Sequence, residues 1–126
     1  DSPGGSVYSG FGIIDIMDFV KSDVSTVNVG LAASMGAIIL AYGENGKRKS
    51  LKRSRTMIHQ PLGGAYGQAS DIEIDAQEII KVKKELYGIL EDKTTQSYDK
   101  IHNDADRDYW MTSKDALDYG LIDIIL

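Results

Sequence analysis

Helical and strand-like patterns alternate along this chain, and the alternation constrains the fold more than any other feature. Apolar stripes and runs with helical end signals predict helices over 7–21, 35–42, 71–93, 98–101 and 112–120. Runs of β-branched and apolar residues predict short strands over 23–30, 55–59 and 121–126. Because helices separate the strands, we expect an α/β fold with largely parallel strands.

Turn-forming residues lie between these predicted elements and at their ends. The small residues at 31–34 are expected to form a bend between a strand and the next helix. Residues 61–70 contain three glycines and no helical stripe, so we expect an extended arm. Thr112 and Asp115 have the spacing of a capping box, and Gly120 is expected to end the helix that they begin.

Composition excludes several classes of protein. The 126 residues suit one domain, and 19 acidic against 14 basic residues argue against nucleic acid as the main partner. The absence of cysteine excludes disulfides, thiolate nucleophiles and cysteine-ligated zinc. The longest mostly apolar stretch, 30–43, is too short to cross a bilayer, so no membrane partner is expected. A start at Asp1 and an apolar end at Leu126 predict that the chain belongs to a longer one.

Ser34 and His59 are the two candidate reactive side chains. Ser34 lies among small residues where a strand-like segment enters a helix, which suits either a nucleophile at a helix N-terminus or an ordinary N-cap. His59 ends a predicted strand just before Pro61, so it is either a general base at a strand end or a histidine packed at the sheet edge. Local sequence leaves both pairs of interpretations open.

The acidic stretch 102–108 offers several carboxylates, one of which could orient His59. Spacing alone does not identify which one. An EF-hand calcium loop starting at Asp104 would need glycine where Tyr109 stands and glutamate where Asp115 stands. We therefore expect no calcium loop and no other metal site.

Two further clusters favour structural interpretations. Residues 47–55 hold 6 of the 14 basic side chains, and a solvated turn explains them better than a patch for an acidic partner. No phosphate-binding glycine motif is present, since 43–47 is too short for one. Tyr109 and Trp110 are expected to pack in the core, as bulky aromatic side chains usually do.

Several motifs together resemble one family, the Clp protease proteolytic subunit (ClpP). They begin with Ser-Pro-Gly-Gly-Ser and lie at 2–6, 30–37, 57–65, 106–108 and 119–123. The resemblance runs over essentially the whole chain in order. It implies a ClpP/crotonase-like repeated β-β-α spiral, in one peptidase domain over 1–126 that lacks the N-terminal part of the family domain. A protruding handle, a strand plus a helix, is expected within it at 61–93.

The resemblance also implies an activity, that of an ATP-dependent serine endopeptidase that hydrolyses unfolded proteins. By position, the family's catalytic triad falls on Ser34 as nucleophile, His59 as base and Asp108 as orienting carboxylate. The backbone N–H groups of Gly5 and Met35 match the family's oxyanion hole. Asp1, Lys52 and Thr56 depart from the usual family pattern, and none of them is a triad member.

Further roles are implied in the same way. Substrate is expected to bind as an added strand along Gly5, Ser6, Val7, Leu62, Gly63 and Gly64. Asp106 and Arg107 match the pair that bridges two heptameric rings in the family's tetradecamer.

The implied partner is an AAA+ Clp unfoldase of the ClpX or ClpA/ClpC type. ATP is the cofactor of that partner, and none is expected in this chain. The setting is protein quality control in the cytoplasm or an organelle matrix. Two alternatives remain: a crotonase-type acyl-CoA enzyme, which needs no serine–histidine pair, and an inactive structural ring subunit.

Overall fold

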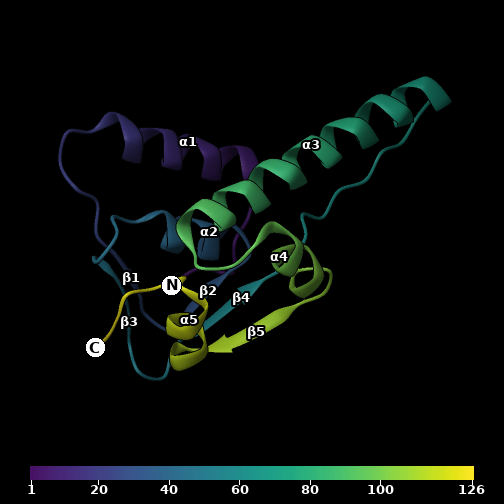
Figure 1. The fold of residues 1–126 in the computed structure, drawn as a ribbon. Coiled ribbons are helices and arrows are strands. Elements are labelled where there is room, and N and C mark those ends of the chain that lie inside the picture. The colour runs from purple at the N-terminus through teal and green to yellow at the C-terminus, as the bar shows by residue number, and fades with distance from the viewer.

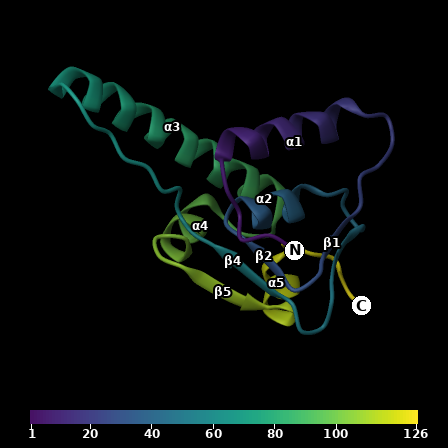
Figure 2. The same cartoon turned by 180° about the vertical axis from the view of Figure 1, so that it is seen from behind.

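The computed structural model describes residues 1–126 as two small sheets with helices packed around them and one long helix that projects from the body (Figures 1 and 2). The helices are α1 Val7–Phe19, α2 Met35–Tyr42, α3 Ala69–Lys93, α4 Tyr98–Asp104 and α5 Ser113–Tyr119. The strands are β1 Thr26–Asn28, β2 Leu31–Ala33, β3 Arg48–Ser50, β4 Arg55–Ile58, β5 Tyr109–Thr112 and β6 Ile124–Ile125. No helix combines the length and apolar character needed to span a bilayer.

The first four strands alternate between the two sheets, which gives the chain its spiral. One sheet has the order β1-β3-β6 and is parallel throughout. In the other, β2 pairs with β4 in parallel and β4 pairs with β5 antiparallel. Two successive units, β1-β2-α2 and β3-β4-α3, therefore repeat the same β-β-α path. This confirms the expected α/β spiral.

Helix α2 is the centre of the hydrophobic core. It is apolar on all sides because it is surrounded: Ala37 and Ala41 are fully buried and contribute to a cluster of 19 buried residues. Helix α1 packs closely on α2 where Gly10 leaves room for the Met35 side chain. From α3, Tyr87 contributes to the same core and is only 1% exposed. Burial raises the pKa of the Tyr87 hydroxyl to about 12.

The expected handle is the most exposed part of the molecule. The arm at 62–68 has no regular structure and is fully solvent-facing, and the first half of α3 is also exposed. Figure 1 shows this arm running outward from β4 beside the projecting half of α3. The second half of α3 is anchored in the core by Val82, Leu86 and Leu90. The helix therefore has one fixed end and one free end.

The five helices lie where the sequence predicts them, but several strand predictions are wrong. Residues 31–33 form β2 where a bend was expected, and no strand was expected at 109–112, where β5 lies. The expected core packing of Trp110 is wrong, since this side chain is 55% exposed. Side chains alternate across a strand, so Tyr109 and Met111 of β5 face inward, whereas Trp110 and Thr112 face outward.

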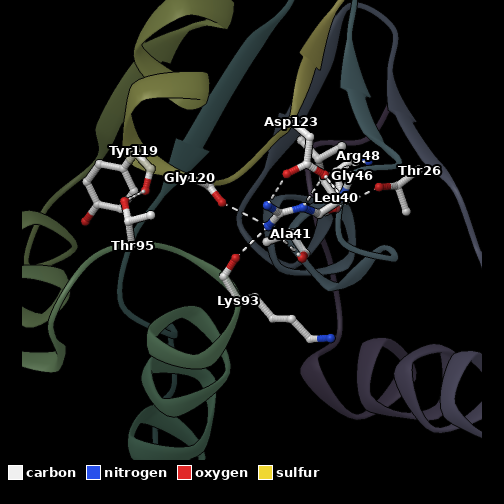
Figure 3. A network of polar contacts seen from close by, with 10 residues as sticks. All are labelled: Thr26, Leu40, Ala41, Gly46, Arg48, Lys93, Thr95, Tyr119, Gly120 and Asp123. Carbon is white, nitrogen blue, oxygen red and sulfur yellow. Dashed lines mark hydrogen bonds and ion pairs between the residues drawn. The ribbon is translucent and has the colours of Figure 1, made fainter.

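The expected solvated turn at 47–55 is also wrong, because it contains β3 and the buried Arg48. The Arg48 Nε and Nη2 atoms donate to the two carboxylate oxygens of Asp123 at 2.9 and 2.6 Å (Figure 3). Its Nη1 donates to the carbonyls of Ala41, Lys93 and Gly120, near the C-terminal ends of α2, α3 and α5.

Arg48 and Asp123, with the carbonyls they hold, form what we call the arginine hub. A cation suits this place because helix C-termini leave carbonyl groups unpaired and carry partial negative charge. The hydrogen bonds from Arg48 hold the pKa of the Asp123 carboxyl below its usual range. The hub therefore ties three helices and the strand β3 into one body.

Candidate active site

Ser34 lies in a sharp turn between β2 and α2. It is the only residue other than glycine with a positive φ, 55°. Its backbone is held on both sides, because its N–H donates to the carbonyl of Met57 and its own carbonyl accepts from the N–H of Ala37. The side chain makes no capping hydrogen bond to the helix. Ser34 therefore occupies the N-cap position of α2 without capping the helix through its side chain, and the hydroxyl is free to point elsewhere.

The Ser34 hydroxyl meets His59. Its Oγ lies 2.8 Å from His59 Nε2, and His59 Nδ1 lies 3.0 Å from Asp108 Oδ1. Strands β2 and β4 are parallel neighbours, so the residues that follow them reach the same edge of the sheet. With the proton on Nδ1, the ring donates to the carboxylate and accepts from the serine hydroxyl. The three side chains form one hydrogen-bonded line.

The register of β4 and β5 explains why Asp108, among several aspartates, meets the histidine. The last pair of that antiparallel ladder is Ile58 with Tyr109. One step beyond it, His59 stands across from Asp108. Residue spacing alone left the orienting acid open, because it gave no sign of β5, and only the family resemblance assigned it to Asp108. The side chain of Asp108 is 60% exposed, whereas that of His59 is 17% exposed.

An open cleft of about 720 Å³ contains Ser34 and His59. The residues expected to bind substrate all line it, namely Gly5, Ser6, Val7, Leu62, Gly63 and Gly64. Sequence analysis missed the third wall, which α3 supplies through Asp75, Glu78 and Ile79. Their spacing of three and four residues, which places side chains on one helix face, was the available signal.

The backbone at Gly4 and Gly5 lies against the serine. Gly4 has a φ of +92°, and a Cβ on it would lie 2.7 Å from the Ser34 Cβ, so only glycine fits there. The Gly5 amide donates no hydrogen bond, and a Cβ at Gly5 would meet no atom within 4 Å. Met35 is the first residue of α2, so its amide has no acceptor within the helix. Both expected oxyanion donors are thus unpaired groups beside Ser34.

The remaining candidate residues lie outside the cleft. Asp106 and Arg107 are exposed in the loop between α4 and β5 and form no ion pair. The Asp104 carboxylate, first ligand of the rejected calcium loop, binds Lys100 Nζ at 2.6 Å and the Tyr119 hydroxyl at 2.9 Å. No group of three or more acidic or histidine side chains is arranged to hold a metal ion.

Comparison with known proteins identifies the family of the chain. The family model of Clp protease matches residues 1–126. The ATP-dependent Clp protease proteolytic subunit of Bacteroides fragilis is 59% identical over all 126 residues, which are 61% of that relative. The corresponding subunit of Porphyromonas gingivalis is 55% identical, with 57% of it covered, and subunit 1 of Prochlorococcus marinus is 58% identical, with 65% covered.

The chain thus spans about three fifths of the length of the curated relatives it matches, and all of it aligns. Identities of this size over the whole chain, together with the matching family model, confirm the resemblance seen in the sequence motifs. The chain belongs to the Clp protease family.

Proposed function

We propose that this chain carries the catalytic residues of an ATP-dependent Clp protease proteolytic subunit, a serine endopeptidase. The observation that supports this most strongly is the hydrogen-bonded line of Ser34, His59 and Asp108 at the edge of an open cleft. A crotonase-type acyl-CoA enzyme would have no need of this line. An inactive ring subunit would not be expected to keep all three side chains in bonding geometry.

The proposed mechanism begins with proton transfer from Ser34 Oγ to His59 Nε2 while Oγ attacks the carbonyl carbon of a peptide bond. The tetrahedral intermediate collapses as His59 returns the proton to the leaving amine, and an acyl-enzyme on Ser34 remains. Water then attacks the ester, His59 takes one proton from it, and the second collapse frees the acid and restores the serine. Asp108 stays ionised and stabilises the imidazolium that forms in each half-reaction.

The amides of Gly5 and Met35 are proposed to hold the negative oxygen of the intermediate. Neither has a competing acceptor in the protein, so both can donate to the substrate. One such donor contributes on the order of 3 kcal/mol to transition-state stabilisation. The N-terminal end of α2 adds a favourable dipole at the same place.

The proposed substrates are unfolded polypeptides bound as an extended strand. The two cleft walls at 5–7 and 62–64 contain three glycines, so they offer main-chain groups and few side chains to a peptide. Recognition through main-chain hydrogen bonds depends little on side-chain identity. Low sequence selectivity follows, which suits the degradation of many proteins.

Assembly and partners are proposed from the same family membership. Two stacked heptameric rings would enclose the cleft, with Asp106 and Arg107 at the contact between rings. Exposed apolar side chains outside the cleft support extensive interfaces, since Phe19 is 83% and Ile74 66% exposed. An AAA+ unfoldase, which consumes ATP, would feed the chamber in the cytoplasm or an organelle matrix.

Peptide hydrolysis by the full-length protein tests the proposal. Wild type is expected to cleave short fluorogenic peptides without ATP, and Ser34→Ala is expected to lose about 10⁶-fold in kcat. Ser9→Ala is a matched control, because Ser9 is exposed on α1 and its side chain makes no hydrogen bond. Activity of Ser34→Ala within tenfold of wild type would rule out the proposed nucleophile.

A further inference from the structure

The geometry points to Gln60 as a positioning residue that holds the loop of Asp108 against His59. This inference rests on the proposed function and adds a residue that the sequence did not single out. Gln60 follows His59 directly, so it is fixed at the same end of β4. Its two bonds to the facing loop lie only two and three residues before Asp108.

Two consecutive carbonyls of that loop accept hydrogen bonds from Gln60. The backbone N–H of Gln60 donates to the carbonyl of Ala105 at 2.7 Å. The side-chain Nε2 of Gln60 donates to the carbonyl of Asp106 at 2.8 Å. Both bonds lie beyond the end of the β4–β5 ladder, where strand pairing no longer holds the two segments together. Gln60 therefore continues the attachment of the loop past the last strand pair.

The Asp108 carboxylate needs such support because it has little of its own. Its single hydrogen-bond partner is His59, and its side chain is 60% exposed. Residues 106–108 are all exposed, so packing does not restrain them. A solvent-exposed carboxylate with one hydrogen bond keeps its position only if the backbone that carries it is held. The hydrogen bonds from Gln60 hold the backbone just before Asp108.

Lys83 of α3 determines which way the Gln60 amide points. Its Nζ lies 3.3 Å from Gln60 Oε1, and an ammonium can only donate. The Asp106 carbonyl can only accept, so it requires the Nε2 side of the amide. The two partners together allow one orientation of the amide. Lys83 also lies over the ring of Tyr87, 5.6 Å from its centroid, which fixes its own position.

The charged groups near His59 come from two elements. The loop after α4 contributes Asp108, which bonds to Nδ1, and α3 contributes Asp75 and Glu78, which line the same cleft. Gln60 does not line the cleft, although both of its neighbours in the sequence do. Its loss is therefore expected to change the alignment of the triad and leave peptide binding intact.

The test compares Gln60→Ala with Gln96→Ala in the full-length protein, using a fluorogenic peptide as substrate. Gln96 is a matched control, because its Nε2 also donates to a backbone carbonyl, that of Tyr119, and neither residue lines the cleft. Gln60→Ala is expected to lower kcat about tenfold or more with KM within twofold, because small misplacements of catalytic groups are costly. Gln96→Ala is expected to change neither value, and thermal unfolding midpoints report on folding separately.

Gln60→Glu separates the hydrogen bond from packing. Glutamate keeps the shape and the acceptor for Lys83 but cannot donate to the Asp106 carbonyl, so we expect it to lower kcat as alanine does. In an Asp108→Ala background, Gln60→Ala is expected to change the rate of fluorophosphonate labelling by less than twofold, since the group it positions is gone.

Three results would overturn the inference while wild type stays active. The first is a kcat for Gln60→Ala equal to that of Gln96→Ala. The second is a rise in the KM of Gln60→Ala at constant kcat. The third is a loss of fluorophosphonate labelling rate on Gln60→Ala that is as large in the Asp108→Ala background as in wild type. A wild type that cleaves no peptide would instead overturn the proposed function, and this inference with it.

Discussion

Two clusters of polar side chains in this protein use similar groups in opposite ways. The arginine hub is closed: the Arg48 side chain is 6% exposed, and each of its three guanidinium nitrogens donates a hydrogen bond. The triad is an open line of two hydrogen bonds that ends in a carboxylate 60% exposed. A cluster in which every guanidinium nitrogen is hydrogen-bonded stabilises a fold, whereas one that keeps an exchangeable proton can react.

The two clusters also differ in what surrounds them. The hub lies where three helices end, so charge and hydrogen bonding are matched to fixed backbone carbonyls. The triad lies at a strand edge beside a cleft of about 720 Å³, where a substrate can approach. Burial in one place and access in the other separate the stabilising cluster from the candidate catalytic one within 126 residues.

The largest expected effect sharpens this contrast on the catalytic side. Asp108→Asn is expected to lower kcat about 10⁴-fold, because the amide cannot hold His59 in the required tautomer. The unfolding free energy should barely change, since the Asp108 side chain is exposed and makes one hydrogen bond. Denaturant unfolding and peptide kinetics on the same variant measure both quantities. A large loss of stability with kcat retained would reverse the roles assigned here.

Substitution in the arginine hub should instead lower the stability of the fold. Arg48→Met is expected to lower the unfolding free energy by about 3–5 kcal/mol, because it leaves the Asp123 carboxylate without its ion-pair partner. Arg53→Met is the matched control, since the guanidinium of Arg53 makes no hydrogen bond or ion pair. Urea unfolding of both variants is the measurement. Equal midpoints for Arg48→Met and Arg53→Met would show that the hub does not stabilise the fold.

A smaller effect tests how closely the backbone supports the serine. Gly4→Ala is expected to cost about 2 kcal/mol, because φ is positive and the new Cβ would collide with Ser34. Gly5→Ala should change stability by less than about 0.5 kcal/mol, because a Cβ there meets open space. Both variants are compared by urea unfolding. Equal losses would mean that the close approach of Gly4 to Ser34 does not matter.

The smallest expected effect is a pH dependence of the hub. Because Arg48 lowers the folded-state pKa of Asp123, the folded state holds this carboxylate ionised more firmly than the unfolded state does. The resulting stability is complete above the unfolded pKa of about 4 and is lost as pH falls through the lower folded pKa. Between pH 6 and 3, the unfolding free energy should decline less steeply for Asp123→Asn than for wild type. Parallel curves would contradict this.

The helices were predictable because their signals are local. The apolar stripe of α3 repeats every three or four residues within one helix. The capping pair, Thr112 and Asp115, is three residues apart, and its capping box is present in the structure. Strand β5 was not predictable, because its four residues depend on pairing with β4, which is 51 residues away in the chain at the nearest pair, Ile58 and Tyr109. The buried position of Arg48 was missed for the same reason, since its partner Asp123 is distant in sequence.

The candidate site divides in the same way. The local context of Ser34, small residues before a helix, was enough to suggest a reactive serine, and a strand end suggested His59. The orienting acid could be placed on Asp108 only through the family resemblance, because the β4–β5 register that brings it to the histidine leaves no local signal. The role inferred for Gln60 depends on two backbone carbonyls, which no sequence pattern marks.

One measurement tests the central claim most directly: the intact mass of the protein after incubation with a serine-reactive fluorophosphonate, for wild type and Ser34→Ala. The account predicts a single adduct on wild type and none on the variant, because only a serine bonded to a histidine base is activated enough to react. No adduct on wild type, or an adduct that persists in Ser34→Ala, would contradict the assignment of Ser34, His59 and Asp108 as a working triad.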